Sequence, residues 1–176
     1  TAARLTDLSS GLENRRALEA SFRRKSKLIV GAVRISDFDQ LEAITAENEA
    51  GQLDRAIARR LQIIAHDETI YRLESGVYGW LIPDSREDDL EEYFSSAYSL
   101  FNAPLDILGQ QLRAKPSFGV SPDTISDAVL ASDFACRRSL RWSSASNSMT
   151  EESQYQQAIL TELDDALESG AISVVY

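Results

Sequence analysis

The chain has 176 residues, of which 43% are hydrophobic and 26% are charged, the composition of one ordinary globular domain with a sizeable core. Its formal net charge of -10 makes double-stranded nucleic acid an unfavourable partner, so we expect no nucleic-acid function. No apolar run approaches the roughly 20 residues that cross a bilayer, and the N-terminal residues lack the apolar segment of a signal peptide. We therefore expect a cytoplasmic domain, although a longer protein could anchor it at a membrane.

Hydrophobic periodicity predicts a chain in which helices and strands alternate. Helices, each with apolar residues on one face, are expected at 14–25, 38–46, 50–65, 86–102 and 125–142. Strands are expected at 27–35, 69–73 and 78–82, followed by a hairpin at 105–108 and 111–120. This order favours an α+β domain with a ferredoxin-like βαββαβ core, in which helices cover a central mixed sheet.

The composition changes after residue 142. Residues 143–149 are mostly small and polar, which predicts a flexible linker. This linker would separate a domain at 1–142 from a second segment at 150–176. We expect Thr150 to cap a C-terminal helix, which a terminal strand would follow.

A single cysteine and a single histidine restrict the possible sites further. Cys136 excludes an internal disulfide and lies on an apolar helical face, which favours a buried core position over a nucleophile. His66 has no second histidine or further cysteine to complete a zinc site, so we expect it in a surface turn. These residues therefore predict no metal centre.

Four segments, at residues 7–16, 72–83, 117–120 and 132–135, match motifs of one protein family. They resemble GGDEF domains, whose active members make cyclic di-GMP. Residues 7–16 (DLSSGLENRR) resemble the family's D-x-L-T-G-L-P-N-R-R opening, which is the most specific match. Residues 72–83 resemble its R-L-G-G-D-E-F hairpin, and residues 117–120 and 132–135 resemble a later strand and helix. The order and approximate spacing agree, and the resemblance implies the nucleotidyl cyclase type of βαββαβ fold.

The residues for catalysis differ from the family pattern. Active members hold two metal ions with carboxylates, because cations must neutralise the triphosphate of GTP. The resemblance places the metal positions of the first strand at Arg34 and Ser36, neither of which is acidic. The hairpin retains only the aromatic position of its motif. Its residues, in the order of that motif, are Glu74, Ser75, Gly76, Val77 and Tyr78.

The positions for guanine, phosphate and product have changed as well. The two guanine-reading positions correspond to Glu42 and Gly51, and the phosphate-contacting lysine corresponds to Leu140. The inhibitory R-x-x-D site corresponds to Ala65 and Glu68. Together these losses imply no catalytic residue, no metal ion and no cofactor, and they argue against GTP binding.

The resemblance therefore implies a degenerate, catalytically inactive GGDEF domain. Residues 160–176 resemble the helix and first strand that open an EAL phosphodiesterase domain, which implies a GGDEF–EAL tandem protein. We expect a regulatory or interaction module that controls the adjacent EAL domain, with a homodimer or another protein as a further partner. Val77, Tyr78 and Trp80 either form a contact surface or pack within the sheet.

In two alternative interpretations, the domain still binds a nucleotide. In the first, the domain senses GTP without turnover and activates the EAL domain, with phosphate contacts from Arg34, Arg72 and Arg137. In the second, it is an active cyclase with unfamiliar metal ligands. The carboxylates available near the hairpin are Asp37, Asp39 and Glu74. Glu74 is displaced from the motif position by two residues, about 6–7 Å along a strand, which is too far to replace a metal ligand.

Overall fold

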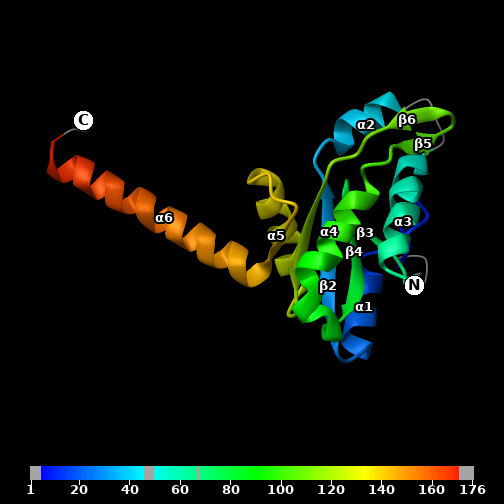
Figure 1. Cartoon of the computed structure of the whole chain (residues 1–176), viewed down its shortest axis with the longest axis horizontal. Helices are drawn as coiled ribbons and strands as arrows, with labels where there is room; N and C mark the ends of the chain where they lie inside the picture. The colour runs from blue at the N-terminus through cyan, green and yellow to red at the C-terminus, as the bar shows by residue number, and fades with distance from the viewer. Residues whose placement is uncertain (1–4, 46–49, 67, 171–176) are drawn as a thin grey trace.

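The computed structural model describes residues 5–45, 50–66 and 68–170. Within them, six strands form one mixed sheet in the order β1-β3-β4-β2-β7-β8 (Figure 1). These strands are β1 (Glu13–Asn14), β2 (Leu28–Ile35), β3 (Tyr71–Glu74), β4 (Val77–Pro83), β7 (Pro116–Ser121) and β8 (Trp142–Ser144). A separate hairpin pairs β5 (Leu105–Ile107) with β6 (Gln110–Leu112).

The helices join these strands into the expected βαββαβ core. In chain order they are α1 (Arg15–Arg24), α2 (Phe38–Ile44), α3 (Gln52–Ile64), the 3-10 helix η2 (Asp84–Asp89), α4 (Leu90–Leu100), α5 (Ile125–Arg137) and α6 (Ala145–Glu168). The four core strands β3, β4, β2 and β7 lie side by side, and β2 is antiparallel to both of its neighbours. The α+β architecture is therefore confirmed.

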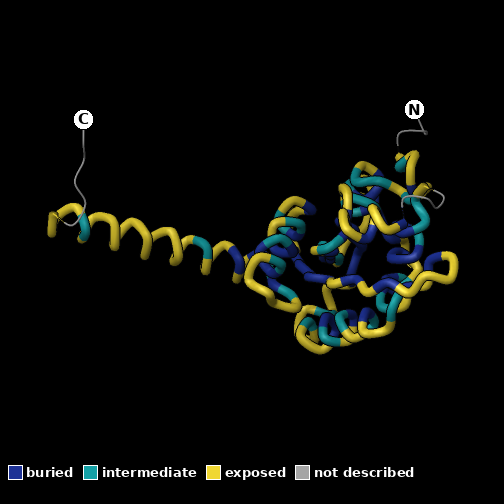
Figure 2. Tube along the Cα trace, turned by 90° about the horizontal axis from the view of Figure 1, so that it is seen from above, coloured by how far each residue is buried: buried dark blue, intermediate teal, exposed yellow. Residues whose placement is uncertain are grey.

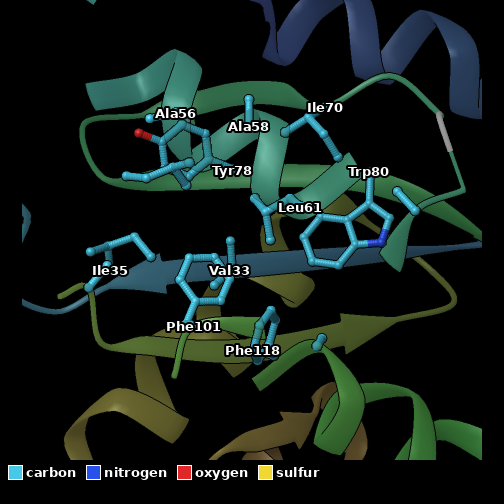
Figure 3. Packing of buried hydrophobic residues seen from close by; sticks show 14 of the residues in the cluster. Val33, Ile35, Ala56, Ala58, Leu61, Ile70, Tyr78, Trp80, Phe101 and Phe118 are labelled. Atoms are coloured by element: carbon cyan, nitrogen blue, oxygen red, sulfur yellow. The ribbon is translucent and has the colours of Figure 1, made fainter. Parts of the chain in front are cut away.

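Strand β2 is buried on both faces of the sheet, as its apolar sequence predicts. Alternate residues such as Ile29 and Val33 belong to a large cluster with α3 and α4, whereas Val30 and Ala32 pack with α1 and α5. Figure 3 shows Val33 in the larger cluster, close to Phe118 of β7. The helices thus cover both faces and fix the ends of β2, where the candidate site lies.

Three element boundaries differ from the sequence prediction. The helix expected at 86–102 begins with η2, and α4 starts only at Leu90. The strand expected at 111–120 is two strands, because β6 pairs with β5 whereas β7 joins the main sheet beside β2. The helix expected at 125–142 ends at Arg137, and the chain then forms β8.

The buried core position expected for Cys136 was wrong in part, and the residues after α5 also depart from the helix expected at 125–142. Cys136 is half-buried and Leu140, beyond the end of the helix, is exposed. Ser139 has a positive φ of 56°, which ends the helical path before Leu140 can turn inward. His66 lies exposed in a turn, as expected.

The flexible linker predicted at 143–149 is wrong. Trp142–Ser144 forms β8, which runs parallel to β7, and α6 begins directly after it. The hydroxyl of Ser144 caps the helix by accepting a hydrogen bond from the Asn147 amide, 3.2 Å away. Thr150 lies inside the helix, where its hydroxyl donates to the Ser146 carbonyl at 2.9 Å. Ser143, Ala145 and Ser148 are buried, so part of this segment packs against the domain.

Helix α6 leaves the body of the domain and extends away from it (Figures 1 and 2). The terminal strand expected at 171–176 lies outside the described residues, and a second domain from residue 150 stays a prediction. None of the helices in the described ranges combines the length and apolar character that a membrane span requires.

Candidate functional site

The β3–β4 hairpin brings residues 74–78, which the resemblance aligns with the family motif, to the end of β2. Its tip contains Gly76, whose φ of +73° is readily adopted only by glycine. An added Cβ there would lie 2.8 Å from Cβ of Phe38, so space as well as conformation requires glycine. The Ile35 amide donates to the Gly76 carbonyl at 2.9 Å. This bond holds the hairpin tip beside Arg34 and Ser36.

Arg34 lies between two carboxylates from different elements. Its Nη2 is 3.0 Å from Oε1 of Glu74 on the hairpin, and its Nε is 3.5 Å from Oδ1 of Asp133 on α5. The Arg34 side chain is 28% exposed and those of Glu74 and Asp133 are 53% and 38% exposed, so water screens both pairs. The position that the resemblance assigns to a metal ligand therefore carries a cation with its own acidic partners.

The residues of this site do not fit a divalent cation. Across residues 5–45, 50–66 and 68–170, no group of three or more histidine, cysteine, aspartate or glutamate side chains could hold a metal ion. The carboxylate of Asp37 accepts a hydrogen bond from the Lys115 amide at 3.2 Å, and Ser36 is exposed. Asp37, Asp39 and Glu74 are thus not brought together as metal ligands.

A second charged network lies on the other side of the hairpin. Nε of Arg72 is 3.1 Å from Oδ1 of Asp54 on α3, and its Nη1 is 3.0 Å from Oδ2 of Asp7 in the turn before β1. The hydroxyl of Tyr78 donates to the same Asp54 oxygen at 2.6 Å. Four side chains from the N-terminal turn, α3 and both hairpin strands therefore form one connected group.

Burial and the neighbouring charges shift the pKa values of Tyr78 and Arg72 in this network. Burial raises the pKa of Tyr78, and the Asp54 carboxylate raises it further, so the phenol stays neutral and can donate. Burial alone would lower the pKa of Arg72, but Asp54 and Asp7 outweigh it and raise that pKa. Arg72 is therefore a permanent cation that is already neutralised by its own domain.

Asp7 is held in its charged form. Burial alone would raise its pKa, but hydrogen bonds from Ser10 and Ser9, with the charge of Arg72, lower the pKa to about 2. The carboxylate accepts from the Ser10 amide at 2.8 Å and from the Ser9 and Ser10 hydroxyls at 2.7 Å. The turn at the start of the domain is thereby fixed to the hairpin.

A cavity of about 290 Å³ adjoins the Arg72 network. It is lined in part by Glu42 and Gly51, so the structure brings together the two positions that the resemblance assigns to guanine recognition. Asp54 and Arg72 form another part of its wall and are bonded to each other. The cavity thus offers a space in which Arg72 already has a carboxylate partner.

Sequence reasoning missed Asp54 and the role of Asp7. Asp54 is only 7% exposed, although it lies in the first turn of an amphipathic helix. Its position between Leu53 and Ile57 could have indicated this, because an acid on the apolar face of a helix requires a buried partner. Arg72 and Tyr78, both in the recognised hairpin, provide that partner.

The proposed contact surface at the hairpin is wrong. Val77, Tyr78 and Trp80 are each 0% exposed, so the alternative, in which they pack within the sheet, is correct. Figure 3 shows Tyr78 and Trp80 within the cluster of buried side chains, with Leu61 between them and Phe118 below. The indole of Trp80 donates to the Tyr93 hydroxyl at 2.8 Å.

The three arginines considered as phosphate contacts all have acidic partners. Arg34 pairs with Glu74, and Arg72 pairs with Asp54 and Asp7, as described above. Arg137 lies 3.2 Å from Asp133 and 3.9 Å from Glu152 on α6. A triphosphate would have to displace these carboxylates.

Comparison with solved structures shows that the chain has the fold of GGDEF domains, the diguanylate cyclase fold. The GGDEF domain of DgcB from Caulobacter crescentus, in complex with c-di-GMP, matches 81% of this chain and 96% of its own with a TM-score of 0.61 and 13% identity. A sensory box/GGDEF family protein from Caulobacter crescentus CB15 matches 76% and 96%, with a TM-score of 0.54 and 25% identity.

A third match involves a complex between proteins. Diguanylate cyclase SiaD from Pseudomonas aeruginosa, in complex with its activator SiaC, matches 78% of this chain and 59% of its own, with a TM-score of 0.53 and 17% identity. No protein-family model and no curated protein matches the sequence.

Proposed function

We propose that this chain is a degenerate GGDEF domain that makes no cyclic di-GMP and acts as a regulatory or interaction module in cyclic di-GMP signalling. One observation carries the proposal. The guanidinium of Arg34 pairs with Glu74 and Asp133 where the resemblance expects a carboxylate that binds metal. The chain therefore has an internal ion pair in place of a metal centre.

The chemistry of phosphoryl transfer explains why this exchange abolishes activity. Cations must neutralise the charge that develops on the triphosphate, and hard divalent ions require oxygen ligands. Arg34 contributes a positive charge that repels such an ion, and it also engages two nearby carboxylates. One guanidinium thus removes both the site for the ion and its ligands, and no catalytic step is assigned to this domain.

A regulatory role is supported by what the domain retains. Its core is intact, and α6 is joined to that core by direct contacts. The guanidinium of Arg138 lies over the rings of Phe134 on α5 and Tyr155 on α6, at 5.3 and 5.2 Å from their centroids. Buried Ser148 adds to this junction. A shift of α5 would therefore move α6, and through it an adjacent EAL domain.

The experiment is a turnover assay on the 176-residue chain with GTP and either Mg²⁺ or Mn²⁺. We expect no cyclic di-GMP by chromatography at any protein concentration, beside an active diguanylate cyclase as the positive control. Turnover that grows with protein concentration would contradict the proposal.

A GTP sensor is the second candidate, and the cavity beside Arg72 is the observation in its favour. It ranks second because Arg34, Arg72 and Arg137 are already paired within the domain. Calorimetry with a non-hydrolysable GTP analogue separates the two candidates. Heat that saturates at one site would support the sensor, and the absence of heat at millimolar analogue would exclude it.

A further inference from the structure

A separate pocket lies where η2 and α4 meet β8 and the start of α6. Its volume is about 470 Å³, within the roughly 300–1,000 Å³ of sites that hold small organic ligands. We call it the Trp142 pocket, after the half-buried tryptophan that lines it. It shares no residue with the Arg34 site or with the cavity beside Arg72.

The inner surface of the Trp142 pocket is apolar. Ile29 of β2 and Val120 of β7, each only 2% exposed, line it from the sheet. Leu90 of α4 and Trp142 of β8 line it as well, and the Trp142 ring stacks on Phe94 with 5.3 Å between the ring centroids. A ligand therefore meets buried aliphatic surface and an aromatic side chain that packing holds in place.

The outer part of the pocket is acidic. Glu87 and Asp88 of η2 and Glu91 of α4 line it and are exposed, and no lysine, arginine or histidine lines it. None of these three carboxylates forms an ion pair within residues 5–45, 50–66 and 68–170. Oε2 of Glu91 accepts a hydrogen bond from the Trp142 indole at 2.7 Å, which holds this carboxylate beside the ring.

The positive groups near the pocket do not neutralise these acids. Arg86 lines a different cavity, beside Tyr93, and the guanidinium of Arg141 lies 5.0 Å from the centroid of the Tyr98 ring. The first turn of α6 contributes about half a positive charge, and the Ser144 hydroxyl already caps it. Three carboxylates outweigh that partial charge, so the pocket favours a cationic ligand.

The chemistry of the pocket selects an organic cation over a metal ion. In the described part of the chain, no group of three or more acidic, histidine or cysteine side chains could hold a metal ion. An alkyl stem gains about 25 cal/mol for each Å² that it buries against Ile29 and Val120, and a metal ion gains nothing there. A planar guanidinium can in addition stack on tryptophan and donate two hydrogen bonds to one carboxylate.

We propose that the Trp142 pocket binds a guanidinium group on an apolar stem. The group lies against Trp142 and pairs with Glu87 and Glu91, and the stem packs on Ile29 and Val120. A free alkylguanidine and an arginine side chain of a partner protein both offer this chemistry. The inference goes beyond the proposed function and does not depend on it, because the pocket is separate from both sites considered for metal and nucleotide.

The first experiment follows the indole N–H signals of the two tryptophans by NMR while butylguanidine is added to the ¹⁵N-labelled chain. The Trp142 signal should shift and saturate, with half-saturation at or below about 1 mM. The signal of Trp80, which is buried and bonded to Tyr93, should stay in place. Butylurea has nearly the same shape without the charge and should move neither signal. An unmoved Trp142 signal at about 10 mM butylguanidine, or equal shifts with butylurea, would overturn the proposal.

The second experiment tests the carboxylates with two matched double variants. Glu87→Gln with Glu91→Gln should weaken binding by at least about tenfold, although the new amide oxygen at position 91 can still accept from the Trp142 indole. Asp84→Asn with Glu92→Gln removes the same charge at exposed residues that do not line the pocket, and should weaken binding by less than about threefold. The Trp80 signal reports whether each variant is folded. Equal weakening in both would indicate general attraction to an acidic segment and would refute the site.

A third titration distinguishes the two sources of the guanidinium. Its probe is an acetylated and amidated tripeptide with arginine between two alanines. Tighter binding of the tripeptide than of butylguanidine would support an arginine of a partner protein, and the reverse order would support a free ligand. If neither probe shifted the Trp142 signal, the proposal would be wrong for both sources.

Discussion

The phenolic oxygen of Tyr78 lies 2.6 Å from Oδ1 of Asp54, and Tyr78 is 0% exposed and Asp54 7%. Tyr78 is the one aromatic position that the hairpin retains from the family motif, and Asp54 comes from α3. Arg72 then joins Asp54 to Asp7 at the start of the domain. The hairpin is thus held to α3 and to the N-terminal turn by a charge network, and this network can be tested.

Removal of the Tyr78 hydroxyl should destabilise the domain. Tyr78→Phe keeps the ring but leaves a buried carboxylate with one donor fewer, so we expect the free energy of unfolding to fall by about 2 kcal/mol. Urea unfolding followed by circular dichroism measures this change. Tyr98→Phe, at a partly exposed tyrosine beside Arg141, is the matched control and should change stability by less than about 0.5 kcal/mol. Equal effects of the two variants would contradict a special role for the Tyr78–Asp54 bond.

The contribution of Asp7 should depend on pH. Its pKa in the folded protein is about 2, below an unfolded value near 3.8, so its stabilisation is present above about pH 4. It is lost as the pH falls through the folded pKa. Asp7→Asn should therefore cost about 1 kcal/mol at pH 6, and the difference from wild type should shrink toward pH 2. Unfolding curves of both proteins from pH 6 to pH 2 provide the test, and a constant difference would argue against the shifted pKa.

Close packing of α5 on β7 predicts a large effect at Gly119. An added Cβ would collide with the Ala128 carbonyl oxygen and the Ser132 amide nitrogen, both backbone atoms of α5. Gly119→Ala should therefore cost about 3 kcal/mol or more. Gly109→Ala, at a turn glycine with φ of +84° and open space around it, should cost only about 1 kcal/mol. Thermal unfolding of the two variants compares the cost of a collision with α5 with the cost of backbone strain. A larger loss of stability in Gly109→Ala than in Gly119→Ala would show that α5 moves aside at little cost.

Replacement of Arg34 should show what the guanidinium does at the position that the resemblance assigns to a metal ligand. Arg34→Asp would gather three carboxylates with Glu74 and Asp133, so we expect a lower Tm that Mn²⁺ raises by at least about 2 °C. Arg34→Gln removes the charge without adding a ligand. It should lower the Tm slightly and leave it insensitive to Mn²⁺. Differential scanning fluorimetry with and without Mn²⁺ distinguishes these outcomes. A rise in the Tm of Arg34→Gln with Mn²⁺ would contradict the expectation that the added carboxylate is needed to bind the ion.

The sequence predicted most of the fold because its strongest patterns are local. The apolar run of β2 and the amphipathic pattern of α3 each determine an element by themselves. The linker prediction for residues 143–149 failed because composition alone cannot distinguish a mobile linker from small residues packed against a domain. Ser143 and Ser148 are buried by contacts with residues that are remote in the sequence.

The candidate site was predictable only in part. Alignment with the motif located Arg34 and Glu74, but their pairing depends on how the hairpin tip meets the end of β2. The partnership of Asp54 with Tyr78 required the packing of α3 on the sheet, which no local pattern specifies. The contact surface considered as one of two alternatives at the hairpin is excluded for the same reason, since Val77, Tyr78 and Trp80 are buried in the packed core.

The most direct test of the account is the binding of Mn²⁺ to the wild-type chain, followed by electron paramagnetic resonance with and without a non-hydrolysable GTP analogue. If Arg34 occupies the former metal position, the signal of free Mn²⁺ should stay at the level set by the analogue alone. Loss of that signal in proportion to added protein, saturating at one or two ions per chain, would contradict the account.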